Sequence, residues 1–346
     1  MSKKLTIGVI GAGAIGLAIA ADFSLAGYPV LMSEIDGFYN RLARTIKVSG
    51  LMFHSPHGVE GAEALVSITQ NYSDFNQCAA VIVATTACAH ATLLSQLVET
   101  LPPQTPIIVM CGNGSALAWA PGRKFLTETS TAPYGARVVP GQPQTLTIKI
   151  LTPRFGVAGN PEGVQAALSV LNLIYREAYP LPPHPLAALL SNPNPLMHVG
   201  IMIANLTRID HHDEFTFYGD GIGSSVNRLI ERKDTERMAL ASKLGFKPVL
   251  FDDFEGVVLI QGQLVTQHFL ECGNIARLAA PQSVQDRYFT EDVSYGLVAW
   301  EALGKYLGVE TPLITAEITL VSTVLNLDLR RVMASRTEKI LQALQI

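Results

Sequence analysis

The stretch LTIGVIGAGAIGLAIAADFSLAGYPVLMSE, residues 5–34, determines the fold of the N-terminal half. Residues 5–10 are mostly apolar, which predicts a short buried strand of a parallel sheet. Residues 15–26 carry apolar side chains around most of a helical surface, and Gly27 follows where a helix would stop. Residues 28–32 predict a second strand. A strand, a helix and a strand in this order indicate a βαβ unit.

A glycine motif lies between the first strand and the helix. The motif has the form G-x-G-x-x-G, in which Gly11 allows a tight turn and Gly13 lets a pyrophosphate approach the backbone. Gly16 allows the helix to pack closely on the strand. A tight turn without a ligand is the alternative, and the spacing and context of the three glycines disfavour it. We therefore expect a Rossmann-type dinucleotide site formed by Gly11, Ala12, Gly13, Ala14, Ile15 and Gly16.

Glu34 indicates which dinucleotide binds. It follows the second strand, 18 residues after Gly16, where an acidic side chain accepts hydrogen bonds from the adenosine ribose. A carboxylate at this place repels a 2′-phosphate, so NAD is favoured as the cofactor. Arg41 and Arg44 leave NADP open, since either could pair with a phosphate. The plainer alternative is that Glu34 or Asp36 only caps a loop.

Polar residues also follow two later strands. Residues 79–84 and 106–110 are predicted as buried strands, with a helix over residues 91–100 between them. Thr85 and Thr86 follow the first of these strands, and Asn113 follows the second. Ligands of such sheets bind beyond the carboxyl ends of the strands, so we expect these three side chains to line the cofactor site.

The remainder of the chain changes character twice. Residues 136–155, rich in Val, Thr, Pro and Gly, are expected to extend the sheet with less regular strands. Residues 179–195 hold six prolines, which suit a linker between domains. Helical patterns follow, with Thr290 expected to cap a helix over residues 291–307, Pro312 in the first turn of the next, and Asp328 capping the last. We place a Rossmann domain at residues 1–183 and a helical substrate domain at residues 184–346.

Composition excludes several classes of protein. The chain has 346 residues, 48% hydrophobic and 16% charged, with a net charge of −4. That charge provides no attraction to nucleic acid or to an anionic membrane. No run of about 20 apolar residues could span a bilayer, and the N-terminus lacks the features of a signal peptide, so we expect a cytoplasmic protein. The four cysteines and eight histidines show no zinc spacing, so no metal is expected.

Two segments hold the groups that could carry chemistry. One is SNPNPLMH at residues 191–198, and the other is DRYFTED at residues 286–292. His198 can exchange a proton near neutral pH, and Asp292 could orient it and favour its protonated form. Arg287 offers a planar fork for a carboxylate. Each residue taken singly has a structural explanation, and spacing in the sequence does not show that the three converge.

The whole chain resembles the octopine/nopaline (opine) dehydrogenase family. The resemblance runs through GAGAIG, TAPYGAR at residues 131–137, NPNPLMH at residues 192–198 and RYFTEDVSYGL at residues 287–297. It implies a Rossmann domain followed by an all-α domain of the 6-phosphogluconate dehydrogenase C-terminal type. It also implies an NAD(P)H-dependent CH–NH oxidoreductase that condenses an amino acid with an α-keto acid. His198 and Asp292 would form the catalytic dyad, and Arg287 and Asn192 would bind substrate.

Two other interpretations stay open on the sequence. One is a ketopantoate-reductase-like or 2-hydroxy-acid dehydrogenase. Ketopantoate reductases resemble one another in a lysine on the helix entering the second domain, whereas this chain has no lysine between Lys149 and Lys233. The other is a protein that senses a dinucleotide without turnover, which would not need His198, Asp292 and Arg287. The sequence leaves a homodimer open.

Overall fold

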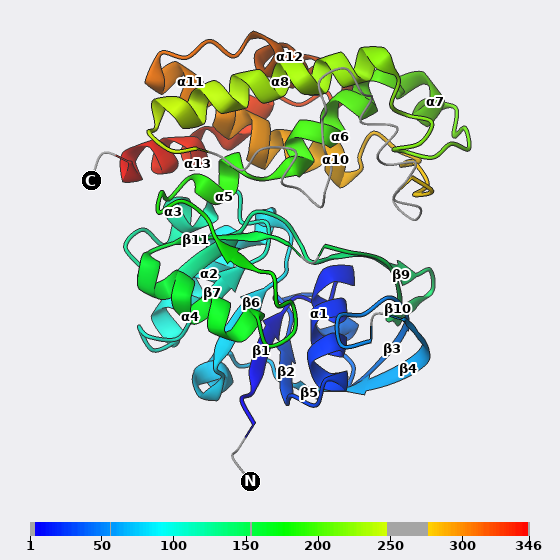
Figure 1. The fold of residues 1–346 in the computed structure, drawn as a ribbon, viewed down its shortest axis with the longest axis vertical. Coiled ribbons are helices and arrows are strands. Elements are labelled where there is room, and N and C mark those ends of the chain that lie inside the picture. Colours follow the sequence, from blue (N-terminus) through cyan, green and yellow to red (C-terminus); the bar gives the residue numbers. More distant parts are fainter. Residues whose placement is uncertain (1–3, 56, 153, 248–275, 345–346) are drawn as a thin grey trace. The chain divides into compact units, whose positions relative to one another are not determined.

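The chain forms two compact units, Met1–Ala188 and Leu189–Ile346 (Figure 1). The computed structural model describes residues 4–55, 57–152, 154–247 and 276–344. The end of the first unit lies five residues beyond the boundary expected within the proline-rich segment. Within the described ranges, no helix is both long enough and apolar enough to cross a membrane.

The first unit is built on an eight-stranded sheet with the order β12-β11-β8-β7-β6-β1-β2-β5. Its pairs are parallel except for β8 with β11. The chain places β2 on one side of β1 and β6 on the other, which makes the carboxyl ends of β1 and β6 a topological switch point. The strands are β1 (Ile7–Ile10), β2 (Val30–Ser33), β5 (Ser67–Ile68), β6 (Ala80–Val83), β7 (Ile107–Val109), β8 (Leu126–Thr129), β11 (Gly156–Gly159) and β12 (Tyr179–Pro180).

Helices cover both faces of this sheet, which explains why its strands are almost continuously apolar. On one face, α1 (Ala14–Leu25) and α4 (Pro161–Leu171) pack against inward side chains such as Ile7 and Val9. On the other face, α2 (His90–Thr100) packs against the strand side chains that point the opposite way. The Rossmann-type sheet predicted from the sequence is confirmed. Shorter helical turns are η1 (Tyr39–Arg41), η2 (Tyr72–Gln77), η3 (Ala87–Ala89) and α3 (Ser115–Trp119).

A second, four-stranded sheet corrects one expectation. Residues 136–155 do not extend the main sheet; most of them form β9 (Tyr134–Val139) and β10 (Gln142–Leu151) of a sheet with the order β4-β3-β10-β9. The cause is a long-range pairing, because β10 runs parallel to β3 (Thr45–Gly50), which itself pairs with β4 (Val59–Leu65). The sequence pattern assigned no strand to β3 or β4. Figure 1 shows α1 beside this second sheet, so the helix contacts both sheets.

A buried carboxylate ties α1 to its surroundings. Asp22 is fully buried, and it accepts hydrogen bonds from the backbone N–H groups of Phe53 (2.7 Å) and His54 (3.1 Å). The side chain of His54 also contacts it, and Tyr134 of β9 donates its hydroxyl proton across 2.7 Å. Burial, together with the nearby Tyr175 and Asp22, raises the pKa of Tyr134 well above its ordinary value. These contacts satisfy a charge that would otherwise be costly inside the core.

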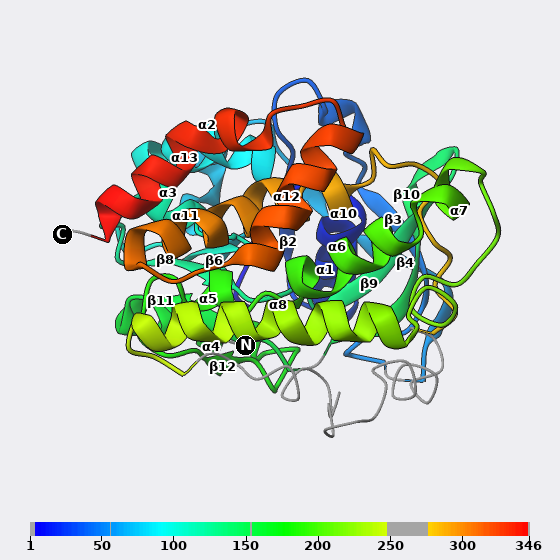
Figure 2. The same cartoon turned by 90° about the horizontal axis from the view of Figure 1, so that it is seen from above.

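The second unit is helical throughout its described elements, apart from one β-bridge between Thr216 and Ala279. The expected all-α second domain is therefore confirmed. Figure 2 shows α8 along one side of this group of helices, with α11, α12 and α13 next to one another. The helices are α5 (Ala187–Leu190), α6 (Pro193–Ala204), α7 (Leu206–Asp210), α8 (Ser224–Lys243), α10 (Arg287–Thr290), the π-helical η5 (Asp292–Leu297), α11 (Val298–Leu307), α12 (Pro312–Val324) and α13 (Leu329–Ala343).

The helix starts agree with the sequence at two places and differ at one. Pro312 lies in the first turn of α12, and Asp328 caps α13 by accepting from the N–H of Arg331, as predicted. The expected cap at Thr290 is wrong. Asp286 accepts from the N–H of Tyr288 at 3.1 Å, so the helical segment begins one turn earlier, and the Thr290 hydroxyl donates to the Asp286 carbonyl. A carboxylate is a strong N-cap, and Asp286 comes before Thr290 in the sequence, so the helical segment begins at Asp286.

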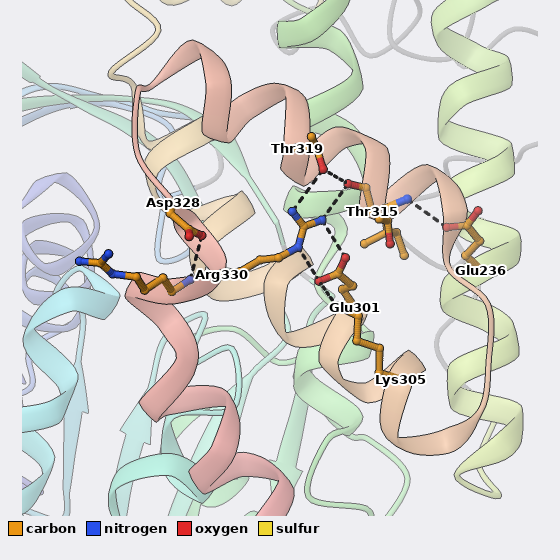
Figure 3. A network of polar contacts seen from close by, with 9 residues as sticks. Glu236, Glu301, Lys305, Thr315, Thr319, Asp328 and Arg330 are labelled. Carbon is orange, nitrogen blue, oxygen red and sulfur yellow. Dashed lines mark hydrogen bonds and ion pairs between the residues drawn. The ribbon is translucent and has the colours of Figure 1, made fainter.

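An ion-pair network joins α11, α12 and α13 (Figure 3). Glu301 of α11 accepts two hydrogen bonds of 2.8 Å from Arg330 and one of 2.9 Å from Lys305, with only 4% of its side chain exposed. Arg330 also donates to the carbonyl of Thr315 at 2.9 Å. Burial alone raises the pKa of Glu301, but the hydrogen bonds from Arg330 and Lys305 outweigh it and hold the pKa at about 2.

This network makes the second unit sensitive to acid. Glu301→Gln removes the charge that Arg330 and Lys305 face, and we expect the free energy of unfolding in urea at pH 7 to fall by about 3 kcal/mol. Because the folded pKa of about 2 lies below the ordinary 4.5, the ionised carboxylate stabilises the fold fully above pH 4.5. That contribution is lost as the pH falls toward 2, so the difference from the unmodified chain should shrink there.

The exposed pair Lys47–Glu63 provides the control. Its nitrogen and oxygen lie 3.7 Å apart with 60% and 57% of the side chains exposed, so Glu63→Gln should change stability by less than about 0.5 kcal/mol. A Glu301→Gln deficit that stays constant from pH 7 to pH 3 would contradict the assignment of the stabilisation to this carboxylate.

Candidate active site

The glycine motif forms the turn from β1 into α1. Gly11 has φ +115°, and a Cβ there would lie 2.6 Å from the carbonyl oxygen of Ala84. A Cβ on Gly16 would lie 1.9 Å from the carbonyl oxygen of Gly11. Only glycine fits either place. Gly13 differs, because a Cβ there would meet nothing within 4 Å, and no side chain caps the start of α1 behind it.

Glu34 lies against this turn. Its Oε2 accepts from the N–H of Ala12 at 2.6 Å, and its Oε1 accepts from the N–H of Ile35 at 2.8 Å. The side chain is 4% exposed and is held in one orientation by these two bonds. Each carboxylate oxygen keeps a second lone pair that can accept a further hydrogen bond. The structure therefore brings Glu34 together with Ala12, at the carboxyl ends of β1 and β2.

The two threonines lie at the carboxyl end of β6, next to the glycine turn. The Thr85 backbone nitrogen would be 3.2 Å from a Cβ on Gly11, which places the two loops in contact. The Thr85 hydroxyl is buried and makes no hydrogen bond with any residue in the described ranges. Thr86 is exposed, and its hydroxyl lies 3.1 Å from the sulfur of Cys88. A buried hydroxyl of this kind costs free energy unless something binds to it.

Asn113 lies in a strained loop after β7. It has φ +56° and is 4% exposed, and the neighbouring Cys111 has φ +50°. A residue that the sequence reading missed holds this loop: the Glu128 carboxylate accepts from the N–H groups of Gly114 at 2.8 Å and Ala116 at 2.5 Å. The sequence held no clear signal for Glu128, because the strand β8 has the mostly polar sequence LTET. The carboxylate stabilises a backbone conformation that non-glycine residues rarely adopt.

In the helical unit, the structure brings His198 and Asp292 together. The Nδ1 atom of His198 on α6 lies 2.7 Å from Oδ2 of Asp292, the first residue of η5. The two residues are 94 positions apart in the sequence and are 5% and 6% exposed. Nδ1 faces a carboxylate, which only accepts, so the proton of a neutral imidazole belongs on Nδ1.

The other ring nitrogen has a partner that the sequence reading missed. His198 Nε2 lies 2.7 Å from the hydroxyl of Tyr218. The ring of Tyr288 lies over the imidazole, with 3.9 Å between centroids and 32° between planes, and Phe217 stacks on Tyr288 in turn. Nothing in the sequence pattern marked Tyr218, because residues 211–223 have no helical or strand periodicity from which to place a side chain.

Arg287 and Asn192 occupy the ends of two helices. Asp286 caps α10 and makes Arg287 its first residue. Arg287 is exposed, and its guanidinium lies 5.7 Å from the centre of the Tyr288 ring, the same ring that stacks on His198. Asn192 is 2% exposed and caps α6, accepting from the N–H of Asn194 at 2.9 Å. Among the described residues, no group of three or more His, Cys, Asp or Glu side chains could hold a metal ion.

Comparison with known families assigns a different match to each half. Residues 182–325 match the model described as NAD/NADP octopine/nopaline dehydrogenase, alpha-helical domain. Residues 7–118 match the ketopantoate reductase PanE/ApbA model. The match to the helical domain includes His198, Tyr218, Arg287 and Asp292.

Similar proteins extend over most of the chain. An opine dehydrogenase of Arthrobacter sp. (strain 1C) is 27% identical, covering 96% of this chain and 94% of its own length. Protein ocs of Agrobacterium tumefaciens (strain Ach5) is 26% identical over 70% of this chain and 66% of its own. Among solved structures, an octopine dehydrogenase in complex with NADH and agmatine has a TM-score of 0.73 at 14% identity, covering 97% of this chain and 96% of its own.

A yersinopine dehydrogenase with bound NADP⁺ is similar to the whole chain as well. Its TM-score is 0.69 at 16% identity, with 99% of this chain and 100% of its own covered. A ketopantoate reductase from Ralstonia eutropha JMP134 has a lower TM-score of 0.62 at 12% identity, covering 92% of this chain and 98% of its own. The match of the helical domain and the relatives that cover most of the chain agree, and they indicate an NAD(P)-dependent dehydrogenase that is similar to the opine dehydrogenases.

Proposed function

We propose that this protein reductively condenses an amino acid with an α-keto acid, using NADH in preference to NADPH. The observation that carries the proposal is the 2.7 Å hydrogen bond between His198 and Asp292, in a helical domain of the octopine/nopaline type. The two substrate classes, an amino acid and an α-keto acid, are part of what we propose. Arginine and pyruvate are ligands named for solved octopine dehydrogenases, and they are the first substrates to try here.

The first unit fits a dinucleotide. Gly13 leaves open space at the start of α1, where backbone N–H groups favour an anion, and the buried Thr85 hydroxyl can bind a ligand group. When bound, the cofactor supplies the hydride. Glu34 would accept from the ribose hydroxyls and oppose a 2′-phosphate. The residues that would hold the dinucleotide are Gly11, Ala12, Gly13, Ala14, Ile15, Gly16, Glu34, Thr85, Thr86 and Asn113.

His198 would act as the acid that the condensation requires. Joining an amine to a ketone releases water, and the departing oxygen needs a proton. Asp292 keeps the Nδ1 side of the imidazole fixed, and its negative charge stabilises the imidazolium. The buried pair is also rigid, because Tyr288 covers one face of the ring. The reacting carbon would thus meet a proton donor whose position is set before substrate arrives.

Arg287 would bind a substrate carboxylate. Its guanidinium is exposed and lies on the Tyr288 ring, which places it one aromatic ring away from His198. A planar fork binds both oxygens of a carboxylate and so fixes the orientation of the neighbouring carbonyl carbon. Asn192 serves α6 as its cap, and we propose that its amide also contributes to the substrate site.

The ketopantoate-reductase-like alternative rests on the match of residues 7–118, which lies within the dinucleotide-binding half. The first long helix of the second unit, α6, carries His198 and no lysine. Lys233 on α8 is fully buried and donates to Glu317 at 2.7 Å, so it does not supply an accessible amine. These observations favour the opine reaction. A non-catalytic sensor would not require the His198–Asp292 pair.

We further propose a cytoplasmic homodimer. The exposed side chains of Leu320 and Val324 on α12 and Val332 on α13 are 51%, 37% and 57% accessible and could be covered by a second copy. Light scattering on the intact chain gives the molar mass that decides between monomer and dimer.

The cofactor assignment can be tested at Gly13. Gly13→Val should fold normally, because a Cβ meets nothing there, yet it should weaken NADH binding about tenfold or more by blocking the pyrophosphate. NADH fluorescence provides the affinity, and the unmodified chain should bind NADH more tightly than NADPH. Gly223→Val is the matched control, since Gly223 also precedes a helix with extended backbone and open space. Equal NADH affinity in both variants would show that the pyrophosphate does not bind at Gly13.

The dyad can be tested by non-additivity. His198→Ala should lower kcat by about 100-fold or more while NADH affinity stays unchanged. Asp292→Asn should also lower kcat, and the double variant should be little worse than His198→Ala, because the two residues act as one unit.

An exposed histidine in the same unit, His211, provides the control for the dyad, and His211→Ala should leave kcat unchanged. Additive losses accompanied by a lower Tm in both single variants would assign His198 and Asp292 to stability alone.

Arg287→Lys separates charge from shape. Lysine keeps the positive charge but loses the two-pronged contact, so we expect KM for the keto acid to rise about tenfold. NADH affinity should stay within twofold of the unmodified chain. Initial rates at varied keto acid concentration measure the first quantity and fluorescence titration the second. Loss of NADH affinity with unchanged KM would place Arg287 outside the substrate site.

A further inference from the structure

The hydroxyl of a tyrosine, Tyr218, contacts the buried imidazole of His198 in the helical unit. His198 is 5% exposed, its Nδ1 faces Asp292, and its Nε2 lies 2.7 Å from the Tyr218 hydroxyl. Tyr218 itself is half-buried. A proton that leaves the imidazole through Nε2 therefore meets the Tyr218 oxygen first.

The loop that carries Tyr218 is held rigidly. Asp220 accepts from the backbone N–H of Thr216 at 2.8 Å and from its hydroxyl at 2.7 Å, and the Thr216 hydroxyl accepts from the N–H of Asp220 at 2.9 Å. The same hydrogen bonds lower the pKa of Asp220, so these bonds persist in mildly acidic solution. The N–H of Phe217 donates to the carbonyl of Leu278 at 2.7 Å.

The Tyr218 ring is also packed in place. Its neighbour Phe217 contacts it edge to face, with centroids 5.0 Å apart, and Phe217 stacks on Tyr288 at 4.8 Å. Tyr288 in turn covers His198 and lies under Arg287. One aromatic group therefore positions the hydroxyl of Tyr218, the imidazole and the guanidinium proposed to bind the substrate carboxylate. A fixed donor at such a site has the orientation that proton transfer requires.

We propose that Tyr218 is a further catalytic residue, whose hydroxyl passes the proton of His198 to the oxygen that leaves as water. This inference rests on the proposed condensation reaction. As the carbon–oxygen bond of the carbinolamine breaks, the Tyr218 hydroxyl proton goes to the departing oxygen. The Nε2 proton of His198 moves to the Tyr218 oxygen in the same step. The nitrogen lone pair of the substrate forms the carbon–nitrogen double bond, and one water molecule is released.

The proton count balances without any further reactant. Tyr218 is a neutral phenol before and after the step, so no tyrosinate accumulates. His198 changes from imidazolium to imidazole, and Asp292 stays ionised and bonded to Nδ1. Because Tyr218 is half-buried, the imidazole can regain a proton from solvent through the Tyr218 oxygen and His198 Nε2. The relay gives a role to both hydrogen bonds of the His198 ring, the one from Nδ1 to Asp292 and the one between Nε2 and Tyr218.

Tyr218→Phe tests the relay, because it keeps the ring packing and removes only the hydroxyl. With NADH, pyruvate and a responsive amino acid, kcat should fall about 100-fold while Tm and NADH affinity stay unchanged. Rates in mixtures of H₂O and D₂O should show two protons in flight in the unmodified chain, as a curved dependence on deuterium fraction. The variant should show a straight line. A purely structural role for Tyr218 would not change the shape of this dependence.

Tyr306→Phe is the matched control, since Tyr306 is a 47% exposed tyrosine on α11. It should leave kcat and the isotope dependence unchanged. If the unmodified chain fails to oxidise NADH with every pair of keto acid and amino acid that is tried, the proposed function is refuted, and the relay with it. An active unmodified chain with Tyr218→Phe within threefold of its kcat would overturn the relay alone. The 2.7 Å contact predicts that the ¹⁵N resonance of His198 Nε2 shifts in Tyr218→Phe and not in Tyr306→Phe.

Discussion

The close approach of α1 to β1 is the constraint on which the first unit depends. The helix lies so near the glycine turn that a Cβ on Gly16 would fall 1.9 Å from the Gly11 carbonyl oxygen. That approach lets α1 contact two sheets at once and buries it on nearly all sides. A helix so enclosed needs its one charged residue satisfied, and Asp22 meets this need by bonding the chain at Phe53 and His54.

The same packing leaves the start of α1 open, where we propose that the dinucleotide binds. Gly13 begins the helix with no side-chain cap, and Glu34 is held beside it through the N–H of Ala12. The loops after β6 and β7 complete this edge of the sheet, with Thr85 against Gly11 and Glu128 holding the strained backbone around Asn113. Preorganised donors and acceptors of this kind lose little conformational entropy when a ligand binds.

The helical unit holds buried polar contacts both in its ion-pair networks and at the proposed catalytic residues. Glu301 with Arg330, and Lys233 with Glu317, join helices that are distant in the sequence. Burial raises the pKa of Glu317, and Lys233 partly counteracts that rise, whereas the pKa of Glu301 is lowered. Against this rigid background, the imidazole of His198 is fixed by a carboxylate on one side and by a phenol on the other. Proton transfer in the proposed condensation depends on such fixed geometry.

The sequence alone was sufficient for local features whose cause lies within a few residues. The glycine spacing at residues 11–16, the apolar strands around it and the helix starts at Pro312 and Asp328 are of this kind, because short-range sterics and hydrogen bonds decide them. Two motifs at residues 192–198 and 287–297 indicated the resemblance to opine dehydrogenases. Only the tertiary structure could place β10 beside β3, bond Glu128 to the Asn113 loop, or set Tyr218 against Nε2 of His198. These contacts join residues that are far apart or lie in irregular segments, and no periodicity in a sequence records which distant partner a backbone or side chain will meet.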